Sequence, residues 1–159
     1  MSAADQAGTA GMYELMAAEM ASLMETDAYF LPVLANASAL LWHTLPDLNW
    51  AGFYLVRSGM LVLGPFQGKP ACIHIQRGRG VCGTAWERDE TVVVEDVHAF
   101  PGHIACDSAS RSEIVVPIHV NGEIMGVLDL DSPREGRFSQ TDREGLEAFV
   151  RVLESAVCW

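Results

Sequence analysis

Two stretches of alternating apolar residues, 113–120 and 123–131, form the clearest secondary-structure pattern in the chain. Successive side chains of a strand point to opposite faces, so each stretch presents one apolar face. Asn121-Gly122 separates the stretches, which predicts an antiparallel hairpin. The opposite faces of these strands carry three carboxylates, Glu113, Asp129 and Asp131.

The register of this hairpin decides whether the three acids meet. A tight two-residue turn would pair Ile114 with Asp129 and so mix apolar and acidic positions. A three-residue loop, or an equivalent bulge, pairs apolar with apolar residues and brings the carboxylates together. We expect one of these two arrangements. A solvated acidic face is the ordinary alternative, but this face also carries Val115, Met125 and Val127, which suits a half-buried pocket better.

The rest of the chain alternates between helical and strand patterns. Apolar residues recur at helical spacing over 11–26, over 28–43 and in a last helix that begins at Ser139 or Thr141. Further strands are expected over 49–57, 60–63, 71–75 and 91–94. Residues 1–10 look like a disordered tail, a glycine-rich loop at 78–83 leads into a short helix, and 95–112 form a long polar loop. This order predicts an α+β fold, and the length suits a single domain over 1–159.

Composition and charge exclude several classes of function. Half of the 159 residues are hydrophobic, and the formal net charge is −11. Such a charge argues against binding to nucleic acids or to anionic membrane surfaces. No apolar run reaches transmembrane length, and the first residues lack the pattern of a signal peptide, so we expect a cytoplasmic protein.

Four cysteines stand out in a chain of this size: Cys72, Cys82, Cys106 and Cys158. In a reducing compartment they are more often buried, metal-bound or catalytic than bridged for stability. Cys106 lies in the long polar loop just before the acidic hairpin, and a thiol beside acids suggests redox chemistry at sulfur on a small charged molecule. Cys82 lies near the start of a short helix, whose dipole would lower the pKa of a thiol.

Three motifs carry a specific resemblance. GxGVCGTA at 78–85, DVHxFPGHIACDxxSxSEIVVP at 96–117 and GVLDLDSP at 126–133 closely resemble the free methionine-(R)-sulfoxide reductases, a family of stand-alone GAF domains. The resemblance runs from about Trp50 to the last helix. It implies a central antiparallel sheet with helices packed on one face and a ligand pocket on the other.

The resemblance also implies roles for individual residues. Cys106 corresponds to the catalytic cysteine, Cys72 to the resolving one, and Cys82 to an accessory or alternative thiol. The acidic positions Glu113, Asp129 and Asp131 and the aromatic positions Trp50 and Tyr54 correspond to substrate-binding residues. The family reduces the R epimer of free methionine sulfoxide and is recycled by thioredoxin, without a cofactor or a metal. The sequence leaves open whether the chain is a monomer or a homodimer.

The residues fit this chemistry on their own terms. A thiolate must attack the sulfoxide sulfur while the oxygen gains a proton, because oxide is a very poor leaving group. Crowded carboxylates do not all ionise, so Glu113 or Asp129 can keep a proton while the others hold the substrate ammonium. Peptide N–H groups from Ala105 to Asp107 would receive the substrate carboxylate or the sulfoxide oxygen, and Trp50 would seat the S-methyl group. Attack leaves a sulfenic acid on Cys106, which a second thiol converts to a disulfide.

Two other functions are compatible with parts of the sequence. A GAF module that senses a small ligand without catalysis is the first, although Arg143 stands where the cyclic-nucleotide signature has Glu. A zinc site built from Cys72, Cys82, His103 and Cys106 is the second, but it lacks a paired C-x-x-C.

The segment that carries Cys72 and Cys82 is also interrupted or flanked by four glycines, Gly68, Gly78, Gly80 and Gly83. Glycine permits large backbone changes, so we expect loop 68–83 to move during the catalytic cycle.

Overall fold

A six-stranded sheet forms the centre of the computed structural model, which describes residues 2–104 and 106–159. Its strand order is β3-β2-β1-β6-β5-β4, and every neighbouring pair is antiparallel. The strands are β1 (Trp50–Arg57), β2 (Met60–Gly68), β3 (His74–Ile75), β4 (Val92–Val94), β5 (Ser112–Val120) and β6 (Glu123–Ser132). The expected central antiparallel sheet is therefore confirmed.

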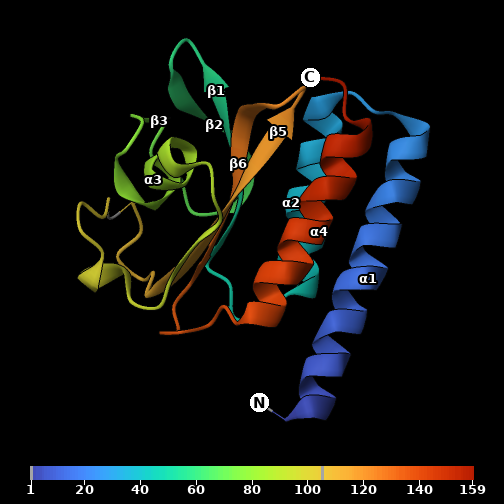
Figure 1. Ribbon diagram of the computed structural model, residues 1–159, viewed down its shortest axis with the longest axis horizontal. Coiled ribbons are helices and arrows are strands. Elements are labelled where there is room, and N and C mark those ends of the chain that lie inside the picture. Colours follow the sequence, from blue (N-terminus) through green and yellow to red (C-terminus); the bar gives the residue numbers. More distant parts are fainter. Residues whose placement is uncertain (1, 105) are drawn as a thin grey trace.

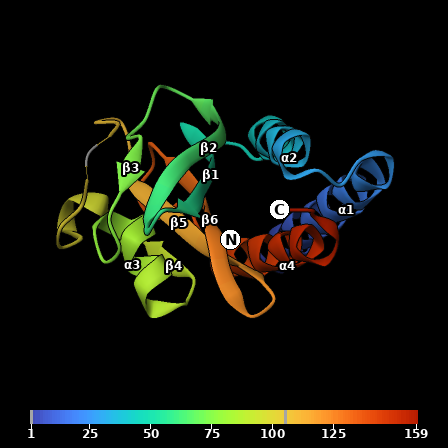
Figure 2. The same ribbon diagram turned by 90° about the horizontal axis from the view of Figure 1, so that it is seen from above.

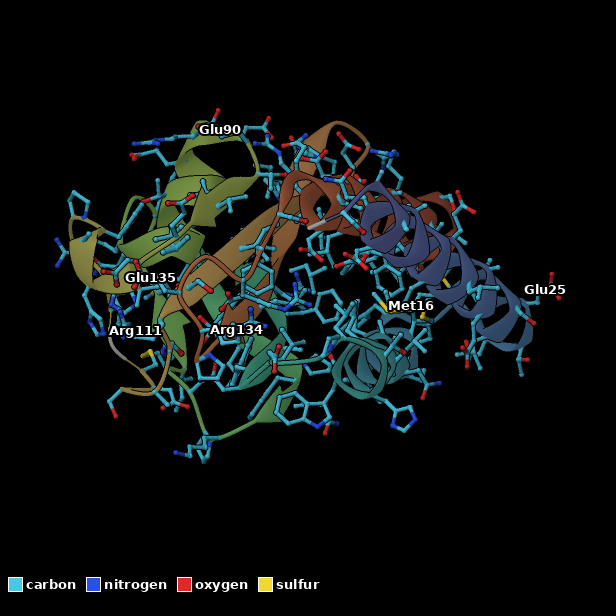
Figure 3. The ribbon with its side chains drawn as sticks, turned by 90° about the horizontal axis from the view of Figure 1, so that it is seen from below. Met16, Glu25, Glu90, Arg111, Arg134 and Glu135 are labelled. Carbon is cyan, nitrogen blue, oxygen red and sulfur yellow. A yellow bond between two sulfur atoms is a disulfide. The ribbon has the colours of Figure 1, made fainter. Side chains whose placement is uncertain are left out.

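Three long helices lie on one side of this sheet: α1 (Ala3–Thr26), α2 (Phe30–Thr44) and α4 (Gln140–Ala156) (Figure 1). α2 and α4 pack on the strands, whereas α1 packs on α4 and α2 and lies outermost (Figure 2). Met16, on the buried stripe of α1, points into this helical layer (Figure 3). The main core joins such helical residues to one sheet face, where Phe53 and Leu128 are fully buried.

The opposite sheet face is covered by the short helix α3 (Gly80–Arg88) and by long connections (Figure 1). A second, smaller apolar cluster lies here, and it includes Trp50, Tyr54, Val115 and Val127. Alternation along the strands therefore serves two cores, one on each face. The expected GAF-like arrangement is confirmed, with the three long helices on one face, whereas the short helix α3 lies on the opposite face.

The β5–β6 hairpin reaches its register through a bulge. Asn121 and Gly122 form a tight two-residue turn, with φ of 53° and 80°, which is the left-handed conformation that such hairpin turns need. A bulge between Ile118 and His119 then shifts the pairing, so that Glu113 lies opposite Asp131. Of the two predicted arrangements, the structure uses the bulge and not the three-residue loop.

Three element boundaries differ from the sequence expectation. Residues expected as a tail are helical from Ala3 onward, because Ser2 and Asp5 form a capping box that starts α1 early. β2 continues to Gly68, whereas β3 is only His74–Ile75. The segment before β3 does not extend the sheet because it runs over the opposite-face pocket, where Cys72 is covalently bonded. α4 begins at the Ser139 cap, one of the two predicted starts.

The long connection expected over 95–112 is present between β4 and β5 and contains one 3-10 turn, Val97–Ala99. Arg111, at its end, donates to Glu135 at 2.9 Å and so ties it to the connection after β6 (Figure 3). Within the described residues, each helix is too short or too polar to cross a membrane.

Candidate active site

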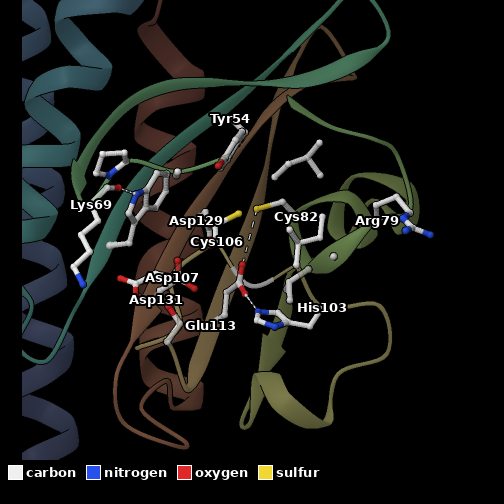
Figure 4. Close-up of a pocket in the computed structure, with 18 residues that line it drawn as sticks. Tyr54, Lys69, Arg79, Cys82, His103, Cys106, Asp107, Glu113, Asp129 and Asp131 are labelled. Carbon is white, nitrogen blue, oxygen red and sulfur yellow. Dashed lines mark hydrogen bonds and ion pairs between the residues drawn. The ribbon is translucent and has the colours of Figure 1, made fainter. Parts of the chain in front are cut away.

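A pocket opens on the sheet face opposite the three long helices, with about 560 Å³ of space including its mouth (Figure 4). Its floor is the central strands. Its rim is the start of α3 together with residues 69–71, 103–104, 106, 107 and 110. The site residues expected from the sequence that are described here line it or bond to its rim: Trp50, Tyr54, Cys72, Cys82, Cys106, Asp107, Glu113, Asp129 and Asp131. Ala105, the remaining expected residue, lies outside the described residues.

Strand pairing brings the three carboxylates together on the pocket floor. Glu113 pairs with Asp131, and Val115 pairs with Asp129, so the bulged register places all three acids on one face. Glu113 is 6% exposed and Asp129 is 5% exposed, while Asp131 is half-buried toward the mouth. Asp129 Oδ1 is buried without a hydrogen-bond partner among the described residues. A buried acceptor of this kind is suited to a donor on a ligand.

Burial and mutual repulsion keep protons on this cluster. Burial raises the pKa of Glu113 well above its usual range, and the neighbouring Asp129 and Asp131 raise it further. Burial likewise raises the pKa of Asp131, again helped by Asp129, and raises the pKa of Asp129 to about 6. Asp129 thus ionises most readily, while Glu113 is suited to act as an acid near neutral pH.

Cys82 lies in the first turn of α3, and its thiol faces the acids (Figure 4). The Sγ atom is 4.0 Å from Glu113 Oε1 and is buried. Burial, followed by the charges of Asp129 and Glu113, raises the pKa of the Cys82 thiol well above its usual value. The lowered thiol pKa expected from the helix dipole is therefore wrong, because desolvation and three nearby carboxylates outweigh the helix terminus.

Cys72 and Cys106 form a disulfide across the mouth of the pocket, with Cα atoms 5.9 Å apart. The bond joins the segment before β3 to the long connection before β5. An intramolecular disulfide between these two cysteines was expected, and it is present. Cys82 is a free thiol, and so is the exposed Cys158, which lies after the end of α4.

Aromatic residues of β1 form one wall of the pocket and hold its rim. Trp50 stacks between Tyr54 and Phe66, with ring centroids 5.8 and 5.1 Å away. Its indole N–H donates to the Lys69 carbonyl at 3.1 Å, and the Tyr54 hydroxyl donates to the Cys72 carbonyl at 2.9 Å. Both aromatic side chains thereby fix the backbone segment that carries Cys72.

Asp107 stands at the pocket rim and is tied down locally. Its Oδ1 accepts from the Ala109 amide at 2.9 Å, and its Oδ2 accepts from the Asn49 side chain at 3.1 Å. The Ala109 amide is the main reason that the pKa of Asp107 is lowered. The Cys106 amide donates to the Ile104 carbonyl at 3.0 Å, so it can serve a substrate only if that bond opens.

Three basic residues of the pocket were not predicted as part of the substrate site. His103 Nε2 is 4.0 Å from Glu113 Oε2, and burial, with a contribution from His98, lowers the pKa of this imidazole. Lys69 and Arg79 also line the rim. His103 could have been found from its position beside Cys106 in the FPGHIACD motif, but the sequence offered it only as a zinc ligand. The four-residue zinc set is not assembled here, because Cys72 and Cys106 are bonded to each other.

Known proteins resemble this chain over most of its length. A family model described as GAF domain matches residues 9–157. The Escherichia coli protein named free methionine-R-sulfoxide reductase is 56% identical over 136 residues, which cover 86% of this chain and 82% of that protein. The Bacillus subtilis protein YtsP is 53% identical over 91% of this chain and 90% of its own length. The structure of fRMsr of Staphylococcus aureus in complex with substrate has a TM-score of 0.87 and 51% identity, over 92% and 95% of the two chains.

Proposed function

This chain belongs to the GAF domain family and, within it, to the free methionine-R-sulfoxide reductases, and we propose that it reduces free L-methionine-(R)-sulfoxide to methionine. The observation that carries this proposal is the Cys72–Cys106 disulfide at the mouth of a pocket floored by three carboxylates. A redox-active pair and a cation-binding floor are what the reduction of a free amino acid sulfoxide requires.

The reaction begins at the Cys106 thiolate, which attacks the sulfoxide sulfur. The sulfoxide oxygen takes a proton from the buried acid pair, for which Glu113 is the better donor because its pKa is raised well above its usual range. This attack forms an S–S bond to the methionine sulfur. The protonated oxygen then passes as hydroxyl from the methionine sulfur to the Cys106 sulfur while the S–S bond breaks and its electron pair leaves with methionine, which gives free methionine and a sulfenic acid on Cys106. Cys72 then attacks the sulfenic sulfur and water leaves, which forms the disulfide seen here. Two thiols are oxidised by two electrons while the sulfoxide becomes a thioether.

Substrate selection follows from the floor and the wall of the pocket. The ammonium group of the free amino acid binds to the half-buried Asp131 and to Asp129, one oxygen of which has no hydrogen-bond partner among the described residues. Trp50 contacts the S-methyl group with its apolar ring. The peptide segment that includes Cys106 and Asp107 receives the carboxylate once the Cys106 amide has released the Ile104 carbonyl. A peptide-bound methionine sulfoxide has no free ammonium, so it leaves buried carboxylates without a partner, which is costly.

A dithiol must reduce the disulfide after each turnover. We infer that thioredoxin supplies these electrons, because the bond lies at the pocket mouth and joins two surface connections. A disulfide that is cycled in this way suits a reducing compartment, so the cytoplasm is the proposed place of action.

Turnover of defined substrates tests this function. We expect rapid methionine release from the free R epimer with thioredoxin, thioredoxin reductase and NADPH, and little from the S epimer. N-acetylated methionine-(R)-sulfoxide should be a far poorer substrate, because acetylation removes the ammonium charge. Equal turnover of the acetylated and free R epimers would overturn the carboxylate role. Binding of the free R epimer to reduced protein without methionine release would indicate a ligand-sensing GAF module instead.

A further inference from the structure

Three chemically different donors converge at the inner end of the pocket, around Cys82. A sulfur of Cys82, an oxygen of Glu113 and an oxygen of Asp129 all lie within 4.8 Å of one another, and all three residues are buried. They come from separate elements, α3, β5 and β6, so the sheet and the helix hold them in place together. The proposed reaction uses Cys106 and Cys72 and leaves the Cys82 thiol without a role.

The spacing of these donors is close to that of a metal site. With Zn–S about 2.3 Å and Zn–O about 2.0–2.2 Å, tetrahedral coordination puts neighbouring ligand atoms roughly 3.5 Å apart. Cys82 Sγ and Glu113 Oε1 are 4.0 Å apart and all three donor atoms lie within 4.8 Å of one another, so a bound ion would draw them closer together. Asp129 Oδ1, which is buried and has no hydrogen-bond partner within the part of the chain that the structure describes, is a second observation that points to a bound cation or donor.

Charge also favours a divalent ion at this position. Asp131 lies next to the cluster on the same sheet face, and His103 is 4.0 Å from Glu113. An ion that binds a thiolate and two carboxylates removes the like-charge repulsion that otherwise keeps protons on them, and it releases those protons. A thiolate with two carboxylates selects a borderline ion such as Zn²⁺ over Mg²⁺ or Ca²⁺, which prefer oxygen ligands alone.

We propose that Cys82, Glu113 and Asp129 form a three-ligand site for Zn²⁺ or a similar thiophilic divalent ion, and that this ion occupies the place of the substrate ammonium. Cys82 gives the pocket a thiol that distinguishes such an ion from an amine. The metal site itself does not depend on the proposed reaction; only its competition with the substrate does. Bound Zn²⁺ would block the pocket and raise the KM for methionine-(R)-sulfoxide.

The test uses the disulfide form of the whole chain, in which Cys72 and Cys106 are not available as ligands. Co²⁺ is titrated as a spectroscopic probe, because a bound cobalt thiolate gives a charge-transfer absorption in the near ultraviolet. We expect this band to saturate at a single ion per chain in the wild type and in the matched control Cys158→Ser, which removes the other free thiol. Cys82→Ala should abolish the band, and the near-isosteric Glu113→Gln should weaken Co²⁺ binding by about tenfold or more.

The outcomes separate the metal site from the proposed reaction. Absence of the band in the wild type, its persistence in Cys82→Ala or its loss in Cys158→Ser would overturn the site. If Cys82→Ala fails to fold, Zn²⁺ calorimetry on Glu113→Gln decides, and unchanged affinity there overturns the site. The disulfide form cannot reduce the substrate, so free methionine-(R)-sulfoxide acts in this experiment only as a competitor. It should displace Co²⁺; failure to do so would overturn the shared position, while turnover measurements on the free R epimer judge the reaction separately.

Discussion

Asp129 shows how one buried residue serves the site at the expense of the fold. Its carboxyl group is 5% exposed, one oxygen has no partner among the described residues, and burial raises its pKa to about 6. A buried carboxylate with an open acceptor stabilises a bound cation and destabilises the empty protein. The Asp129 carboxyl group therefore affects both the affinity for a ligand and the pH dependence of folding stability.

Asp129→Asn should change the pH dependence of stability. A carboxyl group whose pKa is raised from 3.8 to about 6 by folding keeps its proton where the unfolded chain has released it. It favours folding below the unfolded pKa, and this stabilisation is lost as the pH rises through about 6. Asn does not titrate, so the variant should gain roughly 1–3 kcal/mol relative to the wild type from the bottom to the top of this window. Urea unfolding of the disulfide form across that pH range measures the effect.

Asp107→Asn is the matched control for this prediction. The pKa of Asp107 is lowered, chiefly by the Ala109 amide, so its contribution is present above the unfolded pKa and is lost as the pH falls. Over most of the window from 3.8 to about 6 Asp107 is ionised in both the folded and the unfolded chain, so Asp107→Asn should leave the slope of the profile there unchanged. A parallel shift of both would show that Asp129 is not the group responsible.

Single-turnover chemistry should separate the two bonded cysteines. Reduced Cys106→Ser should release no methionine, because the attacking thiolate is gone. Reduced Cys72→Ser should still release up to one methionine per chain but should lose recycling by thioredoxin, because no second thiol closes the disulfide. Methionine is quantified after mixing reduced protein with the free R epimer, and Cys158→Ser serves as an unaffected reference. Full recycling in Cys72→Ser together with its loss in Cys82→Ser would assign the resolving role to Cys82.

At the scale of residues, the sequence predicts side-chain positions correctly where strand periodicity determines them. Alternation along two strands was enough to predict that Glu113, Asp129 and Asp131 share a face. It was not enough for Cys82, whose pKa depends on burial and on charges from strands distant in sequence. The 4.0 Å approach of His103 to Glu113 likewise depends on how the long connection folds over the sheet, which no local pattern encodes.

At the scale of elements, the β5–β6 hairpin illustrates a degeneracy in the sequence. A three-residue loop and a bulge place the acids on the same face, so the pattern of apolar positions cannot distinguish them. The residues of the turn decide between the two arrangements. Asn121-Gly122 favours a two-residue turn with positive φ at both positions, and the bulge then restores the register that pairs apolar with apolar residues. Local preference at the turn is satisfied at the cost of one irregularity in the strands.

Element starts and ends were the least predictable features. The capping box at Ser2 starts α1 in a region whose composition resembled a tail. The segment before β3 resembles a strand in its alternation, yet the disulfide and the Tyr54 hydroxyl hold it over the pocket instead. Tertiary bonds overrule strand propensity in such short segments.

Gly83 controls how closely α3 approaches the segment before it, and hence where Cys82 lies. A Cβ at Gly83 would be 2.4 Å from the Gln76 carbonyl oxygen, so Gly83→Ala must push the helix away. We expect a loss of roughly 1–3 kcal/mol in the free energy of unfolding, as for other overpacked sites, together with weaker metal binding at Cys82.

Gly11→Ala provides the matched control in α1. A Cβ at Gly11 meets nothing within 4 Å, so this substitution should stabilise the protein by about 0.5–1 kcal/mol through helix propensity. Urea unfolding of both variants gives the comparison. Equal stability changes in the two variants would show that the contact at Gln76 does not constrain α3.

At the scale of the whole molecule, the two faces of the sheet differ in how they are held. One face is packed under three long helices that contribute most of the core (Figure 2). The other carries the pocket, α3 and two connections that the Cys72–Cys106 bond joins covalently. Reduction removes this link, so the redox cycle acts on one side of the sheet only.

Hydrogen exchange should report this asymmetry directly. In the disulfide form the connections are linked, and in the reduced form they are free to separate, so amides in 68–83 and 106–110 should exchange faster after reduction. Bound methionine-(R)-sulfoxide should slow them again, because it bridges the acidic floor and the rim. Amides of α1, α2 and α4 serve as an internal reference and should stay unchanged, since their core lies across the sheet. Identical amide exchange of 68–83 in the reduced, substrate-bound and disulfide states would contradict a moving rim. Equally faster exchange in the three long helices after reduction would indicate that the whole protein becomes less stable.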